Sequence, residues 1–357
     1  MEDKNFWKGK KVLVTGHSGF KGGWLTLILN NLGAKVCGIS SESLNNNKKF
    51  FDALQINSHC QSFDVDIRES EAVKNIANEF KPDILFHLAA QPLVRLSYEN
   101  PVDTYDINVM GTLSILELVR SCESIKASVF ITTDKCYENK EWSWGYREND
   151  PMGGHDPYSS SKGCAELLIQ SYQKSFFSLP KSTQGLSSAR AGNVIGGGDF
   201  SPDRLVPDIV EAIIKGKKVK IRNPLATRPW QHVFEPLHGY MMVAEDLFHK
   251  GPVANSSWNF GPHLTDIRTV DELAQIFFDK WGIENIIEYD TSNHPHEAKA
   301  LSLDISKAHD QLKWLPRWGL EKSLENIADW YKAFHLESDL YNISIDQINS
   351  YFNATTN

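Results

Sequence analysis

The stretch TGHSGFKG at residues 15–22 decides the fold of this chain. It follows the apolar run KVLV and precedes an amphipathic stretch, so its glycines stand where a strand gives way to a helix. Gly16, Gly19 and Gly22 let backbone N–H groups at the start of that helix approach a dinucleotide pyrophosphate, which a Cβ at the turn would hold away. In this context the stretch predicts a dinucleotide-binding loop, although the glycines alone would also suit an ordinary strand-to-helix turn.

Outward from this loop, the first half of the chain alternates short apolar runs with amphipathic stretches. This alternation is typical of βαβ units and of a parallel sheet covered by helices on both faces. We therefore predict an α/β fold, a doubly wound parallel sheet of the Rossmann type with a smaller C-terminal substrate-binding domain. The expected strands are 11–16, 34–40, 62–67, 84–90 and 128–133, and the expected helices are 23–32, 69–80 and 113–119.

After about residue 185 the pattern loosens into loops rich in Gly and Pro at 192–204 and 222–230, and such loops commonly carry binding residues. The chain is expected to return to the first domain before it ends, so the two domains interleave. We assign 1–188, with a return segment near 228–255, to the dinucleotide-binding domain, and 189–227 with 256–357 to the substrate domain. Further helices are expected at 208–215, 237–249, 270–281, 306–314 and 320–330, and near 345–352 with Ser344 as N-cap.

Composition places the chain among ordinary globular proteins, with 357 residues of which 41% are hydrophobic. The formal net charge of −8 argues against nucleic acid and against anionic membrane surfaces as partners. We see no run of 18 apolar residues and no apolar signal segment, so neither a membrane span nor a signal peptide is expected. The five cysteines include no C-x-x-C pair, which favours free thiols and a cytoplasmic location.

A second motif is the pair Tyr158 and Lys162, whose i, i+4 spacing puts a phenol and an ammonium on one helical face. A tyrosine with a pKa of about 10 can act as a base near neutral pH only beside a positive charge, which Lys162 can supply. Such a pair is common by chance. Its combination with the glycine loop, and with Thr133 at the end of an expected strand, indicates a proton-abstracting site next to a dinucleotide.

The sequence favours NAD over NADP without deciding between them. The second strand ends in Gly-Ile-Ser-Ser at 38–41, where an Asp or Glu would bond the adenosine ribose, and no Arg or Lys offers a partner for a 2′-phosphate. Asp66 and Ile67, past the third strand, are expected to contact the adenine. Asp66 could equally cap the helix that follows.

Several motifs together carry a family resemblance: TGHSGFKGGWL (15–25), HLAAQPLVR (87–95), TDKCYEN (133–139), WGYREND (144–150), YSSSKG (158–163), ARAGNVIGGGDF (189–200) and RPWQHVFEPL (228–237). The chain resembles the extended short-chain dehydrogenase/reductases, and within them the nucleoside-diphosphate-sugar 4,6-dehydratases. The resemblance covers nearly the whole chain. It implies an NAD cofactor, a nucleoside-diphosphate sugar as substrate, a homodimer or dimer of dimers, and a role in deoxysugar and surface-polysaccharide synthesis.

The resemblance also implies a reaction without net oxidation. Tyr158, oriented by Lys162 and Thr133, would take the proton of the sugar 4-hydroxyl while C4 gives hydride to the nicotinamide. The 4-ketone acidifies the C5 hydrogen, Asp134 would protonate the departing 6-hydroxyl, and the hydride would return to C6.

One position departs from the pattern of the dehydratases that act on deoxythymidine-diphosphate sugars, which carry Asp-Glu after the Thr. This chain has Asp134-Lys135, as expected of the branch that acts on CDP-glucose, so CDP-glucose is the expected substrate. Lys135 would remove the C5 proton itself after losing its own, or would stabilise the enolate while Tyr158 or water takes the proton; it could also be a solvated lysine. The nucleotide base of the substrate would be recognised by residues in loops, around 294–298.

The remaining assignments follow the family motifs. Asn108 would orient Lys162 through water or would only pack within the helix layer. Arg204 and Arg228, expected to bind the pyrophosphate, could each form a surface ion pair instead. His294-Pro-His296 lacks further ligands nearby, so no metal site is expected. A 4-epimerase, which has no use for an acid at Asp134, and a non-catalytic dinucleotide-binding protein stay open as alternatives. The expected cofactor contacts are Gly16, His17, Gly19, Phe20, Lys21, Gly22, Asp66, Ile67, Leu88, Ala89, Ala90, Asn108, Tyr158 and Lys162, and the expected substrate contacts are Gln91, Asn193, Arg204, Arg228 and Asn259.

Overall fold

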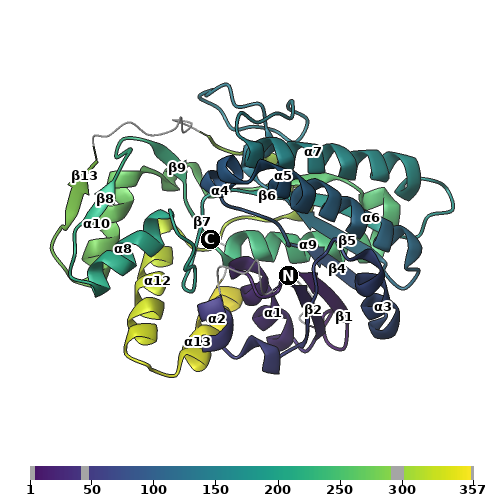
Figure 1. The fold of residues 1–357 in the computed structure, drawn as a ribbon, viewed down its shortest axis with the longest axis horizontal. Coiled ribbons are helices and arrows are strands. Elements are labelled where there is room, and N and C mark those ends of the chain that lie inside the picture. Colours follow the sequence, from purple (N-terminus) through teal and green to yellow (C-terminus); the bar gives the residue numbers. More distant parts are fainter. Residues whose placement is uncertain (1–4, 42–47, 291–300, 355–357) are drawn as a thin grey trace.

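The computed structural model describes residues 5–41, 48–290 and 301–354. Its central sheet contains β1 (Lys11–Thr15), β2 (Lys35–Ser40), β3 (Gln61–Asp64), β4 (Ile84–His87), β5 (Ala127–Ile131), β6 (Gly185–Ala191) and β11 (Ser257–Phe260). The strands are parallel and lie in the order β11-β6-β5-β4-β1-β2-β3 (Figure 1). The order reverses between β1 and β4, and in such sheets ligands bind beyond the carboxyl ends of the strands at this point. The predicted doubly wound fold is confirmed.

Helices cover both faces of the sheet, which explains why its central strands β1, β4 and β5 are mostly apolar. Val12 and Val14 of β1 pack into one core and Leu13 into the other, because successive strand side chains point to opposite faces. The first core is closed by α1 (Phe20–Asn31) and α9 (Phe234–Lys250), and the second by α3 (Ser70–Phe80), α6 (Gly111–Ser121) and α7 (Pro157–Tyr172).

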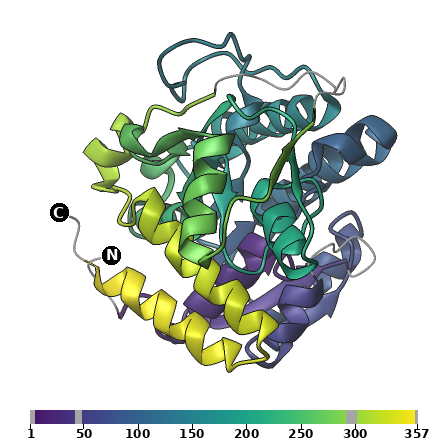
Figure 2. The ribbon, with the colours of Figure 1, turned by 90° about the vertical axis from the view of Figure 1, so that its left-hand side faces the viewer.

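The later part of the chain builds a smaller lobe beside the sheet, on the left in Figure 1. Its two last helices run back along α1 (Figure 2), where Trp330 meets Trp24 with ring centroids 6.5 Å apart. The elements outside the central sheet and its covering helices are α2 (Lys48–Ala53), α4 (Val94–Glu99), α5 (Pro101–Tyr105), α8 (Leu205–Ile214), α10 (Val270–Trp281), α11 (Ser306–Leu312), α12 (Leu320–His335), α13 (Leu340–Asn353), β7 (Val194–Ile195), β8 (Val219–Ile221), β9 (Thr227–Pro229), β10 (Gln231–His232), β12 (Ile267–Thr269) and β13 (Ile287–Tyr289).

The last helix differs from the prediction. It begins at Leu340 after the N-cap Asp339, whose side chain accepts from the backbone N–H of Asn342, so Ser344 is not the N-cap. Ser344 instead lies inside the helix, where its hydroxyl donates to the Leu340 carbonyl at 2.8 Å and accepts from Trp330 Nε1 at 3.0 Å. A serine in mid-helix is tolerated when its hydroxyl bonds the preceding turn in this way.

Two strands end three residues earlier than predicted. β3 ends at Asp64 and not at residue 67, and β4 ends at His87 and not at residue 90. The segments that follow them leave the sheet toward the pocket described below. The segment from 256 onward, assigned to the substrate domain, begins with β11, a strand of the large sheet.

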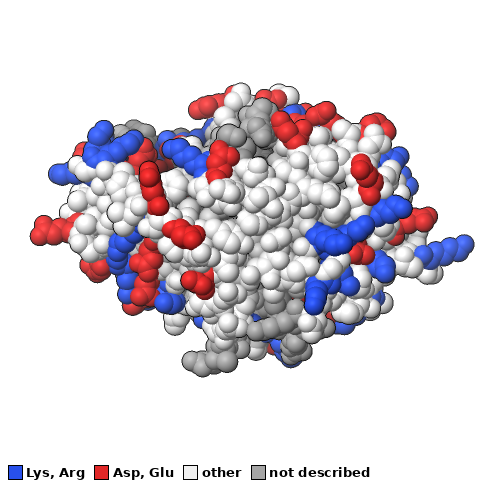
Figure 3. All heavy atoms as spheres, turned by 90° about the horizontal axis from the view of Figure 1, so that it is seen from below, with Lys and Arg blue, Asp and Glu red and all other residues white. Residues whose placement is uncertain are grey.

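The helices in the described part of the chain do not include one with the length and apolar character that a membrane crossing requires. Figure 3 shows one face of the molecule, on which acidic and basic side chains are interspersed around a largely uncharged middle.

Candidate active site

A cavity of about 1490 Å³ opens at the carboxyl ends of the strands, and its wall combines residues of the sheet with residues of the smaller lobe. It is larger than the roughly 300–1,000 Å³ of a typical single-ligand pocket. This size suits a dinucleotide and a second nucleotide together. Of the residues predicted from the sequence, the wall includes Gly16, Gly19, Phe20, Lys21, Gly22, Asp66, Ile67, Leu88, Ala89, Ala90, Gln91, Lys135, Tyr158, Lys162, Asn193, Arg204 and Arg228.

The glycine loop has the tight geometry that its sequence predicts. Gly16 adopts a φ of +76°, and a Cβ there would lie 2.7 Å from the backbone nitrogen of Ala89. A Cβ on Gly22 would lie 2.0 Å from the Gly16 carbonyl oxygen. The N-cap of α1, Gly19, offers no side-chain cap, so the helix start is left to an anion, and the loop fits a dinucleotide pyrophosphate.

His17 supports this loop from behind and is not part of the pocket wall. Its Nε2 bonds Ser62 Oγ at 2.7 Å and its Nδ1 bonds Ser40 Oγ at 3.0 Å. Burial lowers the pKa of His17 to about 4, so the ring is neutral near pH 7. Gly38 of β2 makes room for it, because a Cβ there would lie 2.2 Å from the ring. The predicted cofactor contact of His17 is therefore indirect in this structure.

Asp66 lines the cavity, but its carboxylate is held by Arg68, whose Nη2 lies 2.6 Å from Oδ2. Arg68 lowers the pKa of Asp66 through these hydrogen bonds. The alternative that Asp66 caps the next helix is not seen, since the N-cap of α3 is Glu69. Ile67 is buried against Gly111, and it forms the wall at this point.

Tyr158 and Lys162 lie in the first turns of α7. The helix starts cleanly because the N-cap Asp156 accepts from the Ser159 N–H at 2.9 Å and Pro157 follows the cap. Burial raises the pKa of Tyr158 to about 12, although its hydrogen bond with Thr133 opposes the rise. Burial also lowers the pKa of Lys162 to about 8. Arg204 also favours the Tyr158 phenolate, but it and the Thr133 hydrogen bond do not offset the effect of burial.

Thr133 and Asp134 follow β5 and are almost fully buried, at 6% and 2% exposure, just behind the wall. Thr133 Oγ1 donates to Asp134 Oδ1 at 2.9 Å, and Asn193 Nδ2 donates to Oδ2 at 3.4 Å. Lys21 also faces Asp134, and burial lowers the pKa of Lys21 to about 7. The carboxyl group is thus placed beside Tyr158, Thr133 and two lysines.

Three predicted ligand contacts have their polar groups bonded within the protein. Asn108 is buried, donates to Ser161 Oγ at 2.9 Å and to the Gln91 carbonyl at 3.0 Å, and so ties α7 to the segment after β4. Gln91 donates to Thr104 Oγ1 at 2.9 Å. Asn259 accepts from Tyr137 Oη at 2.8 Å, and its amide nitrogen donates to the carbonyls of Tyr146 and Asp304. Asn108 and Asn259 do not belong to the cavity wall, and Asn259 has no donor left for a phosphate.

The predicted arginines do reach the cavity. Arg204 Nη1 contacts Asp199 Oδ2 at 3.0 Å, and Arg228 Nη1 donates to the Thr227 carbonyl at 2.8 Å. Both line the cavity, where a planar guanidinium suits the binding of a pyrophosphate.

Sequence reasoning missed other residues. Arg95 and Arg222 line the cavity and both pair with Asp203, and the loops that hold Asp203 and Arg222 had been recognised only as binding loops. It also missed the buried pair of Glu166 and Arg190, although Arg190 stands inside the motif ARAGN. The available signal was a single charged residue between two alanines at the end of β6.

Among the described residues, no group of three or more His, Cys, Asp and Glu is placed to hold a metal ion. His294 and His296, and the segment expected to read the base, lie outside the described residues.

A nucleotide-binding loop, a Tyr-Lys pair and a Thr-Asp-Lys turn around one cavity define a Rossmann-type enzyme class that performs redox chemistry on a nucleotide-linked substrate. The chain belongs to the family described as GDP-mannose 4,6 dehydratase, whose model matches residues 13–327. A CDP-glucose 4,6-dehydratase of Salmonella typhimurium is 51% identical over 359 residues, covering 100% of both chains.

Solved structures agree with the fold. A dTDP-glucose 4,6-dehydratase of Bacillus anthracis in complex with NAD superposes with a TM-score of 0.77 at 24% identity, covering 92% of this chain and 99% of that one. The epimerase Mth375 of Methanothermobacter thermautotrophicus gives a TM-score of 0.81 at 22% identity, with 94% and 96% covered. Dehydratases and epimerases therefore share this fold, and the site has to distinguish them.

Proposed function

We propose that this protein is an NAD-dependent CDP-glucose 4,6-dehydratase, a hydro-lyase that converts CDP-glucose to CDP-4-keto-6-deoxyglucose and water. The observation that carries the proposal is the placement of Asp134 and Lys135 directly after Thr133, beside Tyr158 and Lys162 in one cavity. The full-length similarity to the Salmonella typhimurium enzyme supports the same substrate.

Each residue has a task in this reaction. Tyr158 removes the 4-hydroxyl proton, and Lys162 keeps the phenol ionisable. Asp134 protonates the departing 6-hydroxyl, and Lys135 serves the C5 carbanion, as the base or as the cation that stabilises the enolate. When bound, NAD supplies the acceptor for the C4 hydride and the donor that returns it to C6.

The proton balance gives Thr133 a further task. The C5 proton is removed in the elimination and a proton is returned to C5 when the hydride adds at C6, so in the net balance the proton lost from O4 matches the one that completes the departing water. It is taken up by Tyr158 and given out by Asp134. Thr133 contacts both groups, since it hydrogen-bonds the Tyr158 phenol and donates to Asp134 Oδ1 at 2.9 Å. We infer that its hydroxyl passes the proton from the base to the acid.

The binding roles follow the wall of the cavity. The glycine loop and Leu88 to Ala90 hold the dinucleotide, while Asn193, Arg204 and Arg228 hold the sugar nucleotide. The protein is proposed to use the interleaved domains described above, with 1–188 and the segment near 228–255 binding NAD.

We also infer how the protein assembles and where it works. Exposed apolar side chains gather on the segments from α4 to α7, which suits a homodimer interface, and they include Tyr98, Val102, Met110, Leu167 and Phe176. We place the enzyme in the cytoplasm, supplying a deoxysugar for O-antigen synthesis.

The test is incubation of the purified protein with NAD and CDP-glucose, with alkali development of the 4-keto product. Equal competition by dTDP-, UDP- and GDP-glucose would refute cytidine specificity, and absence of the keto product would refute the dehydratase. Asp134→Asn separates the epimerase alternative. A dehydratase should lose elimination by about 10²–10⁴-fold, whereas an epimerase should keep its rate.

A further inference from the structure

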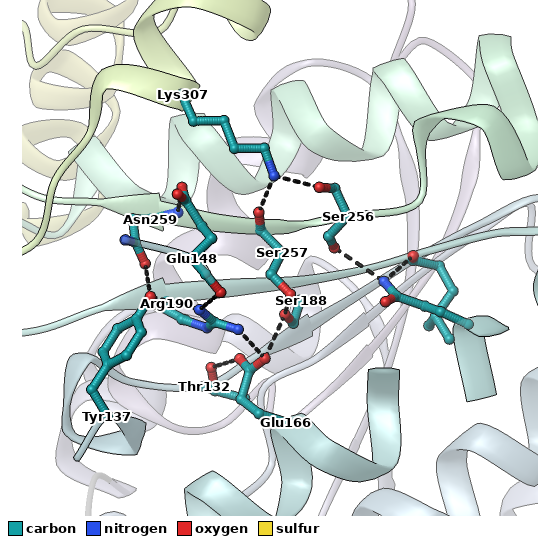
Figure 4. Close-up of polar contacts among 12 residues, drawn as sticks. Thr132, Tyr137, Glu148, Glu166, Ser188, Arg190, Ser256, Ser257, Asn259 and Lys307 are labelled. Carbon is teal, nitrogen blue, oxygen red and sulfur yellow. Dashed lines mark hydrogen bonds and ion pairs between the residues drawn. The ribbon is translucent and has the colours of Figure 1, made fainter. Parts of the chain in front are cut away.

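A buried ion pair lies beneath the helix that carries Tyr158 and Lys162. Glu166 of α7 and Arg190 of β6 are both fully buried, with Arg190 Nη2 2.6 Å from Glu166 Oε2. Figure 4 shows the pair at the centre of a polar network that joins the sheet, α7 and the smaller lobe. The proposed reaction gives this pair no task so far.

Donors from two strands converge on the Glu166 carboxylate. Thr132 Oγ1 donates to Oε1 at 2.5 Å, and Ser188 Oγ donates to Oε2 at 2.8 Å beside the Arg190 contact. Burial by itself would raise the pKa of Glu166, but Arg190 and the hydroxyl donors hold it below its usual range. Since Thr132 immediately precedes Thr133, the carboxylate also fixes α7 to the end of β5.

Arg190 is itself held in place. Its Nη1 donates to Tyr137 Oη at 2.5 Å and to the Glu148 carbonyl at 3.0 Å, and its guanidinium lies 5.0 Å from the centre of the Tyr137 ring. Such a pair is poor evidence for stability, because its desolvation cost offsets most of its attraction. The pair is better explained by a neighbouring group that needs the negative charge.

That neighbour is Lys162, one helical turn before Glu166 on the same face of α7. Burial lowers the pKa of Lys162, and Glu166 opposes this most strongly, followed by Cys136. The other groups that face Lys162 do not help: Lys21 of α1 is a like charge, and His87 of β4 is buried and neutral.

We propose that Glu166 and Arg190 are positioning residues for the reaction: Arg190 fixes an ionised Glu166 one turn from Lys162, and Glu166 keeps Lys162 charged beside Tyr158. This inference rests on the proposed roles of Tyr158 and Lys162. It explains why a costly buried carboxylate stands where an apolar residue would pack.

The test measures Lys162 directly, without substrate. The full-length protein is labelled with limiting acetic anhydride from about pH 5 to about pH 10, where a lysine with a lowered pKa titrates, and modification of Lys162 is followed by mass spectrometry. In Glu166→Gln the labelling midpoint should fall by about one to three pH units, because a neighbouring opposite charge shifts a pKa by that amount. With CDP-glucose, the alkaline limit of turnover should fall by the same amount.

Two further variants keep the test decisive. Glu166→Gln leaves Arg190 buried without its partner and is at risk of not folding, so Glu166→Gln/Arg190→Met, which removes both charges, is measured beside it. A smaller fall in the same direction is expected there, because the Arg190 cation is removed too. Glu148→Gln is the matched control: its carboxylate belongs to the same network but accepts from the Asn259 backbone at 3.0 Å. It should leave the Lys162 midpoint unchanged.

A Lys162 midpoint that stays at its wild-type value in the double variant would overturn the proposal. So would a fall in turnover by the same factor at every pH, because that is the mark of a merely structural pair. If CDP-glucose is not turned over, the proposed function fails while the labelling result still decides the role of Glu166.

Discussion

Replacement of Gly192 by alanine tests whether the position of the Asp134 carboxyl group governs elimination. Gly192 is the residue against which this group packs. A Cβ built on Gly192 would lie 1.9 Å from Asp134 Oδ2, 2.1 Å from Cγ and 2.4 Å from Oδ1. Ordinary contacts begin at 3.4 Å, so the carboxyl group has to move by more than 1 Å for the methyl group to fit.

The size of the effect follows from this displacement. In the unaltered protein the Asp134 carboxyl group lies 2.9 Å from Thr133 Oγ1 and within reach of Asn193 Nδ2. Its displacement breaks the alignment with both groups. A misplacement of about 1 Å commonly costs about 10²-fold in rate, while overpacking costs about 1–3 kcal/mol of stability. We therefore expect Gly192→Ala to fold and to form the 4-keto product about 100-fold more slowly.

The assay separates the two half-reactions. Oxidation at C4 is followed by the absorbance of the reduced nicotinamide, and elimination by the alkali-developed 4-keto product. The reduced cofactor should accumulate in Gly192→Ala, because oxidation uses Tyr158 and not Asp134. Gly261→Ala is the matched control: it is a buried glycine near the same lobe, where the nearest atoms to a Cβ lie at 3.5 Å. A folded Gly192→Ala variant that makes keto product at the wild-type rate would refute Asp134 as the acid.

Two other substitutions probe separate parts of the structure. Tyr158→Phe should slow the formation of reduced nicotinamide by about 10²–10⁴-fold, while NAD binding measured by calorimetry is unchanged. Formation of reduced nicotinamide at the wild-type rate would exclude the phenol as the base. Glu235→Gln should change the pH dependence of stability. Burial raises the pKa of Glu235 from 4.5 to about 7, so the folded state binds more protons than the unfolded state in this window, and stability falls as the pH rises through it. The melting temperature of the variant should change less between pH 4.5 and about 7 than that of the wild type. The same slope of melting temperature against pH in both proteins would contradict the raised pKa of Glu235.

The features that could be predicted from sequence share one property, which is that a local pattern decides them. The glycine loop is determined by spacing within eight residues, and Tyr158 with Lys162 by one helical turn. The observed loop, sheet and cavity agree with these patterns because strand and helix periodicities leave few alternatives for which side chains meet at the strand ends.

The features that could not be predicted depend on which partner a polar group finds. Asn259 was expected to bind phosphate, but its amide is taken by Tyr137, Tyr146 and Asp304, which are between 45 and 122 residues away in the chain. The Asp66 carboxylate, which was expected to contact the adenine, is likewise bonded to the Arg68 guanidinium. Arg190 and Glu166 were missed because periodicity gives the face of a residue but not the ion pair formed across the core.

The charge of the cavity connects the acidic composition with the proposed ligands. A chain of net charge −8 binds two pyrophosphates only if positive charge is concentrated at the site, and Lys21, Lys162, Arg204 and Arg228 are all on its wall. Burial lowers the pKa of Lys21 to about 7 and of Lys162 to about 8, so near pH 7 Lys21 carries only part of its charge while Lys162 stays mostly charged. An entering pyrophosphate raises both pKa values, because a neighbouring anion favours the charged form. The charge of Lys21 therefore rises most when an anionic ligand enters, and together with Lys162, Arg204 and Arg228 it gives an acidic protein a positively charged site for anionic ligands.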